Sequence, residues 1–157
     1  MINIRRECRL IVRLWATWLV FGVWLPVQAD ERILSFESDI TVHSDGNMVV
    51  HETIRVRAEG KSIKRGIYRD FPTRYRDRYG RNYVVDFQLL TVDRNGLPDA
   101  HHIENRSNGV RIYIGSADNF INPDVYTYSI GYITSRQLGF FSDHDELYWN
   151  VTGNDWT

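Results

Sequence analysis

The sequence predicts an all-β fold, and three observations indicate an antiparallel β-sandwich. From residue 30 onward the chain consists of strand-length runs in which apolar and polar residues alternate. Turn-forming Gly, Asn and Asp residues separate these runs. No stretch after residue 30 has the 3.6-residue apolar period of an amphipathic helix. The content of 43% hydrophobic and 25% charged residues is ordinary for one globular domain.

The first 29 residues are predicted to be a signal peptide. Four arginines precede an apolar run of twelve residues, Leu14–Leu25, and the segment ends at the small residue Ala29. We therefore expect the mature chain to begin at Asp30 and to be exported to the periplasm or the extracytoplasmic face of the membrane. A retained N-terminal anchor is the alternative, although a spanning helix needs roughly 20 apolar residues.

Removal of the signal peptide changes the charge of the chain. The full sequence has 19 basic and 20 acidic residues, and loss of four arginines and Glu7 leaves 15 and 19, a net charge of −4. Nucleic-acid-binding domains are usually strongly basic, so we expect no nucleic-acid partner. Cys8 is the one cysteine in the chain and leaves with the signal, so the mature domain has no disulfide.

The first two predicted strands form a hairpin. Residues 33–43 alternate between apolar and polar, and Met48–Arg57 return after a turn at Asp45-Gly46, where glycine supplies a positive φ. The apolar positions of the second strand are Met48, Val50, Ile54 and Val56. Glu52 is in phase with these four, so the pattern places its carboxylate on the core side.

A carboxylate on the core side predicts a cation beside it, because burial of an unpaired charge is too costly. Arg65 and Arg69 are the candidates. Arg69 is preferred because it lies between Ile67 and Phe71, whose side chains can anchor their strand over the core. A guanidinium can bind a carboxylate through two parallel hydrogen bonds. We therefore predict a structural ion pair between Glu52 and Arg69; a bulge that turns Glu52 toward water is the alternative.

Basic residues are concentrated in residues 61–81, where eight of them accompany two acidic residues and give a local charge of +6. The part from Arg74 to Arg81 has no apolar period and is predicted to be an exposed loop. The expected partners are an envelope protein, an anionic envelope polymer or anionic lipid headgroups, and a merely solvated loop is the alternative. The predicted binding residues are Arg65, Tyr68, Arg69, Arg74, Tyr75, Arg76 and Arg78.

Four further strands complete the prediction. They cover Tyr83–Val92, Val110–Ile114, Val125–Ile133 and Leu147–Val151. In the third of these, Tyr126, Tyr128 and Tyr132 share one face. Residues 97–109 have only a weak pattern.

Several short motifs resemble the YciQ-like family of uncharacterised bacterial membrane proteins. Together they cover most of residues 31–156 in the same order. They are Ser44-Asp45-Gly46 leading to Val50-His51-Glu52, Arg65-Gly66-Ile67-Tyr68-Arg69-Asp70-Phe71-Pro72, Ile112-Tyr113-Ile114-Gly115, Tyr126-Thr127-Tyr128, and the stretch from Glu146 to Trp156. The resemblance implies an extracytoplasmic β-rich domain of unknown function that is tethered to a membrane. Members of the family continue into transmembrane helices, so we expect residues 30–157 to be a domain truncated at its C-terminus, without its anchor.

The sequence contains no catalytic signature. It has no Gly-x-Ser-x-Gly elbow and no mature cysteine, which removes two common nucleophiles. The acidic run Asp143-His144-Asp145-Glu146 lacks the spacing of an EF-hand, and His101-His102 point to opposite faces if they lie in a strand. We predict no metal site and no cofactor.

Two functional hypotheses of different classes follow from these patterns. The first is a non-catalytic interaction module of the cell envelope that binds its partner through the basic stretch and exposed aromatic residues. The second is an envelope hydrolase that uses carboxylates near Glu52, Asp143 and Asp145. A concave site at which acidic residues converge would favour the second hypothesis.

Overall fold

A computed structural model describes residues 30–77, 79–147, 149 and 151 of the chain. The predicted signal peptide and the binding candidate Arg78 lie outside these described residues. The prediction of an all-β fold is confirmed, because the regular elements of the described part are strands and every pairing is antiparallel. The strands are β1 (Arg32–Val42), β2 (Met48–Ala58), β3 (Ile67–Pro72), β4 (Arg74–Arg76), β5 (Asn82–Val84), β6 (Phe87–Arg94), β7 (Leu97–Pro98), β8 (His101–Arg106), β9 (Gly109–Ile114), β10 (Asp124–Thr134), β11 (Leu138–Phe140) and β12 (Asp145–Leu147).

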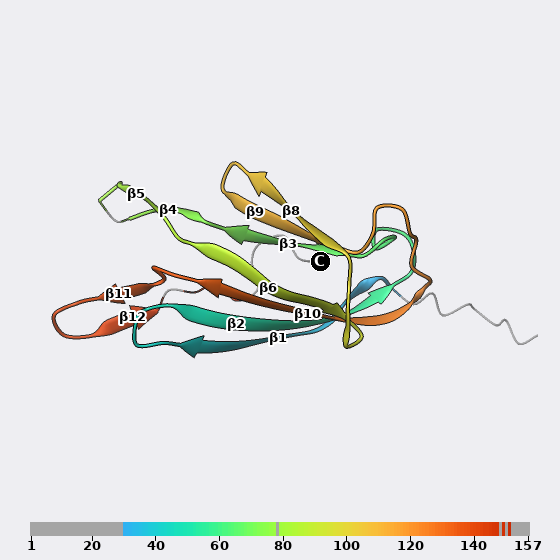
Figure 1. The fold of residues 1–157 in the computed structure, drawn as a ribbon, viewed down its shortest axis with the longest axis horizontal. Coiled ribbons are helices and arrows are strands. Elements are labelled where there is room, and N and C mark those ends of the chain that lie inside the picture. The colour runs from blue at the N-terminus through green and yellow to red at the C-terminus, as the bar shows by residue number, and fades with distance from the viewer. Residues whose placement is uncertain (1–29, 78, 148, 150, 152–157) are drawn as a thin grey trace, which may run out of the picture.

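Two larger sheets form the body of the molecule. One has five strands in the order β1-β2-β10-β6-β7, and the other has three in the order β3-β9-β8. Figure 1 shows them as two layers, with β3, β8 and β9 above the five-stranded sheet. Two small hairpins, β4–β5 and β11–β12, extend from the same end of the two layers.

The strands β1 and β2 form the predicted hairpin, and they are joined at the predicted turn. The backbone N–H of Gly46 donates to the His43 carbonyl at 3.0 Å, and Gly46 has a φ of 81°. The Asp45 carboxylate accepts a hydrogen bond from the Asn47 N–H at 3.0 Å. The turn is therefore closed by the residues that the Asp-Gly signal indicated.

The hydrophobic core lies between the two larger sheets. Phe71 of β3 contacts the rings of Phe87 and Tyr132 in the opposite sheet, with centroids 4.6 and 5.2 Å apart. Trp149 packs on the same ring at 5.8 Å. The apolar residues that are buried here are Met48, Val50, Ile54, Val56, Phe71, Val85, Val92, Ile112, Ile114, Tyr128, Ile130 and Tyr132.

Glycines hold β3 close against β9 at both ends of their pairing. A Cβ atom at Gly66 would collide with the carbonyl oxygen of Ile114, and one at Gly109 would collide with that of Phe71. Both glycines have positive φ, 141° and 149°, which L side chains rarely adopt. This close approach fixes the position of β3 against β9 within the three-stranded sheet.

The single strand predicted over Tyr83–Val92 is wrong, because the structure divides it into β5 and β6. The chain passes there from the small hairpin to the five-stranded sheet. The Val85 N–H donates to the Thr73 carbonyl at 2.9 Å, and Ser135 donates to the Asp86 carboxylate at 2.7 Å. Val85 is buried at the crossing point, so its apolar character reflects the core and not a continuous strand.

The exposed loop predicted over Arg74–Arg81 is also wrong, because it contains β4 and the turn of a hairpin. Tyr75 and Tyr83 pair across the two strands and their rings stack at 5.6 Å. Within residues 97–109 the weak pattern conceals β8, whose six residues are all exposed at the edge of the three-stranded sheet. An edge strand without a buried face produces no apolar alternation.

The strand predicted over Leu147–Val151 differs in position. The structure places β12 at Asp145–Leu147, paired with β11, a strand that the sequence analysis missed. Trp149 and Val151 lie outside the strands. Trp149 packs instead on the rings of Phe71 and Tyr132, which explains the apolar character of this stretch.

Candidate functional site

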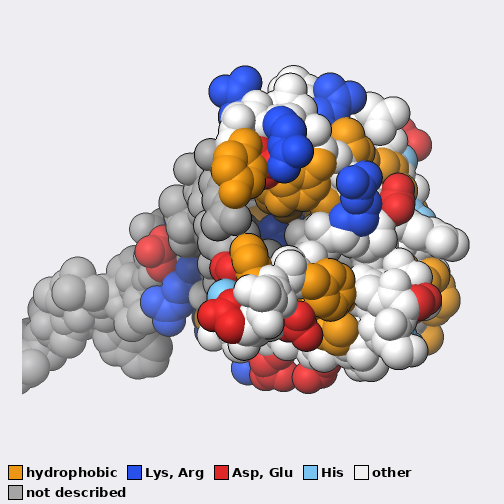
Figure 2. All heavy atoms as spheres, turned by 90° about the vertical axis from the view of Figure 1, so that its left-hand side faces the viewer, with side chains coloured by type: hydrophobic (Ala, Val, Ile, Leu, Met, Phe, Trp, Pro, Cys, Tyr) orange, Lys and Arg blue, Asp and Glu red, His pale blue; other side chains and the backbone are white. Residues whose placement is uncertain are grey.

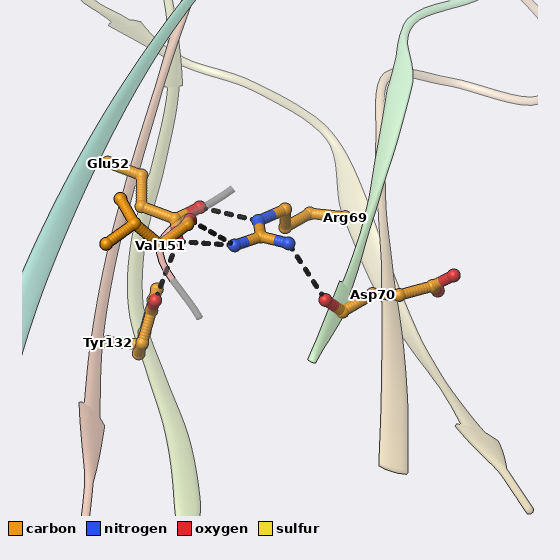
Figure 3. Close-up of polar contacts among 5 residues, drawn as sticks. All are labelled: Glu52, Arg69, Asp70, Tyr132 and Val151. Atoms are coloured by element: carbon orange, nitrogen blue, oxygen red, sulfur yellow. Dashed lines mark hydrogen bonds and ion pairs between the residues drawn. The ribbon is translucent and has the colours of Figure 1, made fainter. Parts of the chain in front are cut away.

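The structure brings Glu52 and Arg69 together between the two larger sheets. Glu52 projects from β2 and Arg69 from β3, and the two side chains meet as Figure 3 shows. The Nε of Arg69 donates to Oε2 of Glu52 at 2.8 Å, and an Nη2 hydrogen donates to Oε1 at 2.9 Å. The residues are only 1% and 4% exposed. The pair has the bidentate geometry that gives an arginine–carboxylate contact its strength.

Three further groups complete this buried network. The hydroxyl of Tyr132 in β10 donates to Oε1 of Glu52 at 2.7 Å. Arg69 also donates to two backbone carbonyls, that of Asp70 at 3.1 Å and that of Val151 at 3.2 Å. The network therefore connects β2 and β10 of one sheet with β3 of the other and with the backbone of Val151.

The electrostatics of the network keep Arg69 and Tyr132 in one protonation state each. Burial alone would lower the pKa of the Arg69 guanidinium, but the hydrogen bonds and charge of Glu52 outweigh it and raise that pKa. Burial and the neighbouring Glu52 carboxylate raise the pKa of the Tyr132 hydroxyl well above its usual range. Arg69 therefore stays charged and Tyr132 stays a donor. Both oxygens of Glu52 already accept hydrogen bonds, so this carboxylate acts as a structural contact between the sheets.

The predicted binding residues do not form one surface. Arg65 lies before β3 with its guanidinium 4.1 Å from the Phe120 ring, whereas Arg74 and Arg76 follow β3 on the projecting hairpin. The six residues of β3 that separate these positions span about 20 Å. Arg69 is buried, for the reason given above. The alternation of β3 thus places Arg69 in the core. The length of β3 places Arg65 at one end of the strand and Arg74 and Arg76 beyond the other.

Tyr68 lies on the outer face of the three-stranded sheet, next to a residue that the sequence analysis did not single out. The guanidinium of Arg111 in β9 lies 4.0 Å from the Tyr68 ring. The same guanidinium makes two hydrogen bonds to the Asp70 carboxylate, both 2.6 Å long. Cross-strand neighbours on an exposed face account for these contacts, and the register pairs Asp70 with Arg111 directly.

A cleft lies at the end of the molecule from which the two hairpins extend. Its volume is about 1010 Å³, and Figure 2 looks toward this end. The turn between β1 and β2 forms part of its lining. Aromatic and charged side chains line the rest of it, and they include Tyr75, Arg76, Tyr79, Tyr83, Arg136, Phe140, Phe141 and Glu146. Of the predicted binding residues, Tyr75 and Arg76 belong to this cleft.

The carboxylates of the alternative hydrolase hypothesis do not converge. Glu52 is buried against Arg69 and Tyr132, whereas Asp143 and Asp145 are exposed at the β11–β12 hairpin. Within the described ranges, no group of three or more His, Cys, Asp or Glu side chains is placed to hold a metal ion.

Comparison with known proteins places the chain in a family. Residues 32–157 match a family model described as the N-terminal domain of a predicted membrane protein (DUF2207). The chain belongs to this family. The resemblance to the YciQ-like proteins is thereby confirmed, and the DUF2207 family is one of predicted membrane proteins whose function is unknown.

One DUF2207 relative is the uncharacterized protein YciQ of Escherichia coli (strain K12). It is 31% identical over 127 residues, which cover 81% of this chain and 20% of the relative. The chain thus spans about a fifth of the length of the curated relative it matches. No solved structure matches the chain. Helices of the length and apolarity needed to cross a membrane do not occur in the part of the chain that the structure describes.

The sequence analysis missed several residues of the buried network and of the cleft. These residues differ in how clearly the sequence indicates their position. Tyr132 shares the apolar face of its predicted strand, and a buried tyrosine hydroxyl normally needs an acceptor. That reasoning could have linked it to Glu52. The Val151 carbonyl carries no side-chain signal. Phe140 and Phe141 stand side by side directly before an acidic run, and because neighbouring residues of a strand point to opposite faces, at least one of the two rings could have been expected at the surface.

Proposed function

We propose that residues 30–157 are an exported, non-catalytic interaction module of the cell envelope, built as a β-sandwich. Its contact surface is the end of the molecule that carries the β4–β5 hairpin. The proposal is supported by the arrangement of charged and aromatic side chains on that hairpin. Arg74 and Arg76 are exposed on it, and the rings of Tyr75 and Tyr83 stack on its opposite face.

The register of the hairpin explains the arrangement. Tyr75 pairs with Tyr83, while Arg74 and Arg76 pair with Val84 and Asn82, so cations and aromatic rings alternate between its two faces. Arg76 has no ion-pair partner among the described residues, which leaves its charge available to a ligand. A carboxylate or phosphate is the natural partner of such a guanidinium. The partner is an envelope protein or an anionic envelope polymer.

The exported location rests on the N-terminal arginines and the apolar run that follows them. Protein recovered from outside the cytoplasm is expected to begin at Asp30, because Ala29 ends the predicted signal peptide. N-terminal sequencing of the exported protein checks this expectation. An intact N-terminus on membrane-bound protein would instead establish the anchor.

Binding to envelope material tests the proposed contact surface. Immobilised exported protein is incubated with a solubilised envelope fraction, and the captured material is compared between the wild type and the variant Arg74→Ser/Arg76→Ser. We expect the double variant to capture at least about tenfold less, with the remaining binding weakened by salt. The matched control is Arg32→Ser/Arg55→Ser, which removes two exposed arginines from β1 and β2. Equal losses for the two double variants would mean that only the total charge matters.

A further inference from the structure

Exposed apolar side chains gather around the cleft between the two hairpins. Phe140 is 71% exposed and Tyr79 is 68% exposed. Four more exposed apolar residues belong to the strand ends or the turns at this end of the molecule: Val42, Val84, Phe141 and Leu147. Figure 2 shows hydrophobic side chains above and below the hollow. An exposed apolar cluster of this kind indicates a surface that another molecule covers.

The two walls of the cleft differ in charge. The upper wall, the β4–β5 hairpin, carries Arg74, Arg76 and Arg81, and Asp77 is its one described acidic residue, already paired with Arg81 at 2.9 Å. The lower wall, the β11–β12 hairpin, carries the carboxylates Asp143, Asp145 and Glu146, of which Glu146 lines the cleft. Figure 2 shows the basic side chains mostly in the upper half of this end and acidic ones mostly in the lower half.

Arg76 lines the cleft from the upper wall and Glu146 from the lower wall, and Asp45 and Arg136 line it from turns outside the two hairpins. Neither Arg76 nor Glu146 makes an ion pair with another described residue. A polyanion would be attracted by Arg76 but repelled by the acidic wall around Glu146. The matching ligand therefore carries both signs of charge, as a polypeptide does.

The hairpins also have strand edges that no other described strand pairs with. Each is a two-stranded ribbon whose strands are three residues long. A two-stranded ribbon is only marginally stable alone, and a third strand adds backbone hydrogen bonds to it. Unpaired edges of this kind are the surfaces to which extended peptides add in β-strand recognition.

We propose that the cleft binds an extended polypeptide segment of a partner protein, which adds as a strand to the edge of a hairpin. Apolar side chains of the segment lie between Tyr79 and Tyr83 on one wall and Phe140 on the other. An acidic side chain of the segment pairs with Arg76, and a basic one pairs with Glu146. This inference rests on the proposed function, because it names the partner class for the same contact surface.

Selection from a phage-displayed library of random twelve-residue peptides, with immobilised wild-type exported protein as bait, tests the inference. We expect enriched peptides that combine one or two aromatic or aliphatic residues with one acidic and one basic residue. Phe140→Ser is expected to bind these peptides at least about tenfold more weakly. Its matched control is Phe120→Ser, because Phe120 is 68% exposed but does not line the cleft. Both residues are surface residues, and equal melting temperatures will show that both variants fold.

The same peptide selection with charge-reversed variants is a second test of the inference. Arg76→Glu is expected to select a basic residue in place of the acidic one, and Glu146→Lys an acidic residue in place of the basic one. N-methylation of alternate backbone amides in an enriched peptide is expected to abolish binding if the peptide adds as a strand. Binding that survives methylation of either set of amides would overturn strand addition.

The outcomes separate the two proposals. Equal peptide binding by Phe140→Ser and Phe120→Ser, or no enriched peptide at all, overturns the peptide cleft. If the wild type then still captures envelope material through Arg74 and Arg76, the interaction module stands and its partner is an anionic polymer. If the wild type captures neither peptide nor envelope material, the proposed function itself fails.

Discussion

Two consecutive residues of β3 make the same kind of contact in opposite environments. Arg69 binds Glu52 between the sheets through hydrogen bonds of 2.8 and 2.9 Å, and Asp70 binds Arg111 on the outer face through two of 2.6 Å. The side chains of the first pair are 5% and 0% exposed. In the second pair, Arg111 is 25% and Asp70 is 51% exposed. The strand alternation alone decides which pair is buried.

The comparison shows that short hydrogen bonds alone do not determine how much an ion pair contributes to the free energy of unfolding. A surface pair gains little, because water already solvates both charges. A buried pair has lost that solvation, so removal of one partner of the Glu52 network strongly destabilises the fold. The intact pair nevertheless adds little stability compared with two apolar side chains in the same place. Its clearer role is to fix the position of β3 over β2 and β10. The predictions below test this contrast, starting with the largest expected effect.

Removal of one partner of the buried pair is expected to have the largest effect. Glu52→Gln or Arg69→Met alone should lower the free energy of unfolding by roughly 3–5 kcal/mol, because each leaves the other charge buried without its partner. Denaturant unfolding of the two variants measures the loss.

The double variant Glu52→Gln/Arg69→Met completes a mutant cycle for the same pair. It should be less destabilised than the sum of the single variants, since it leaves no unpaired charge. Single losses below about 1 kcal/mol, or losses that simply add, would show that the two residues do not interact in solution.

Removal of the Tyr132 hydroxyl tests the third member of the network. Tyr132→Phe keeps the ring against Phe71 and Phe87 but deletes the hydrogen bond to the Glu52 carboxylate. A hydrogen bond to a charged group contributes about 1.5–3 kcal/mol, and we expect a loss of that size in denaturant unfolding. Tyr128→Phe is the matched control. Tyr128 is buried in the same strand, but its hydroxyl makes no hydrogen bond to a carboxylate of the described residues. An equal loss in both variants would assign the effect to packing.

The exposed pair is expected to contribute much less. Asp70→Asn or Arg111→Met should lower the free energy of unfolding by about 1 kcal/mol or less, despite the short hydrogen bonds. The measurement is the same denaturant unfolding, performed at low and at high salt. Screening should reduce the loss for Asp70→Asn at high salt and leave that for Glu52→Gln nearly unchanged. A loss of several kcal/mol for Asp70→Asn would remove the contrast between the two pairs.

The smallest expected effect is a pH dependence of the exposed pair. Hydrogen bonds from Arg111 lower the pKa of Asp70 in the folded protein. The unfolded chain has the ordinary value near 3.9, so the contribution is complete above about pH 4 and is lost as the pH falls through the lower, folded pKa. The stability difference between the wild type and Asp70→Asn is expected to narrow in that acidic range. Unfolding curves from pH 6 to pH 3 would show a constant difference if Asp70 were not paired.

The sequence predicted the parts of the fold that have one buried and one exposed face. The alternation around Glu52 located β2 correctly and placed its carboxylate on the core side, and the Asp45-Gly46 signal located the turn of the hairpin. The position of Arg69 between Ile67 and Phe71 identified its contact with Glu52. These inferences succeeded because a strand with one buried face has a period of two in its sequence.

The remaining errors have physical causes. β8 is exposed along its whole length, so no apolar pattern marks it. The chain leaves the β4–β5 hairpin and enters the five-stranded sheet within residues 83–92, and this crossing divides the predicted strand into β5 and β6. Val85 would be apolar in one continuous strand as well as at the buried crossing, so its side chain does not reveal the break. The cleft depends on two hairpins that are far apart in the sequence, and no local pattern brings Tyr79 and Phe140 to one end. Long-range placement of this kind is a property of the whole topology.

The position of β10 in the five-stranded sheet has a consequence for the order of folding. β10 lies between β2 and β6, although it follows both of them in the chain. Tyr132 is 80 residues from its partner Glu52, whereas Arg69 is only 17 residues away. As the chain is synthesised, Glu52 and Arg69 can therefore meet early, while the edges of β2 and β6 stay open until the last long strand is inserted between them. Contacts of such long separation slow folding, so the unfinished sheet is the stage at which this domain is most exposed to aggregation.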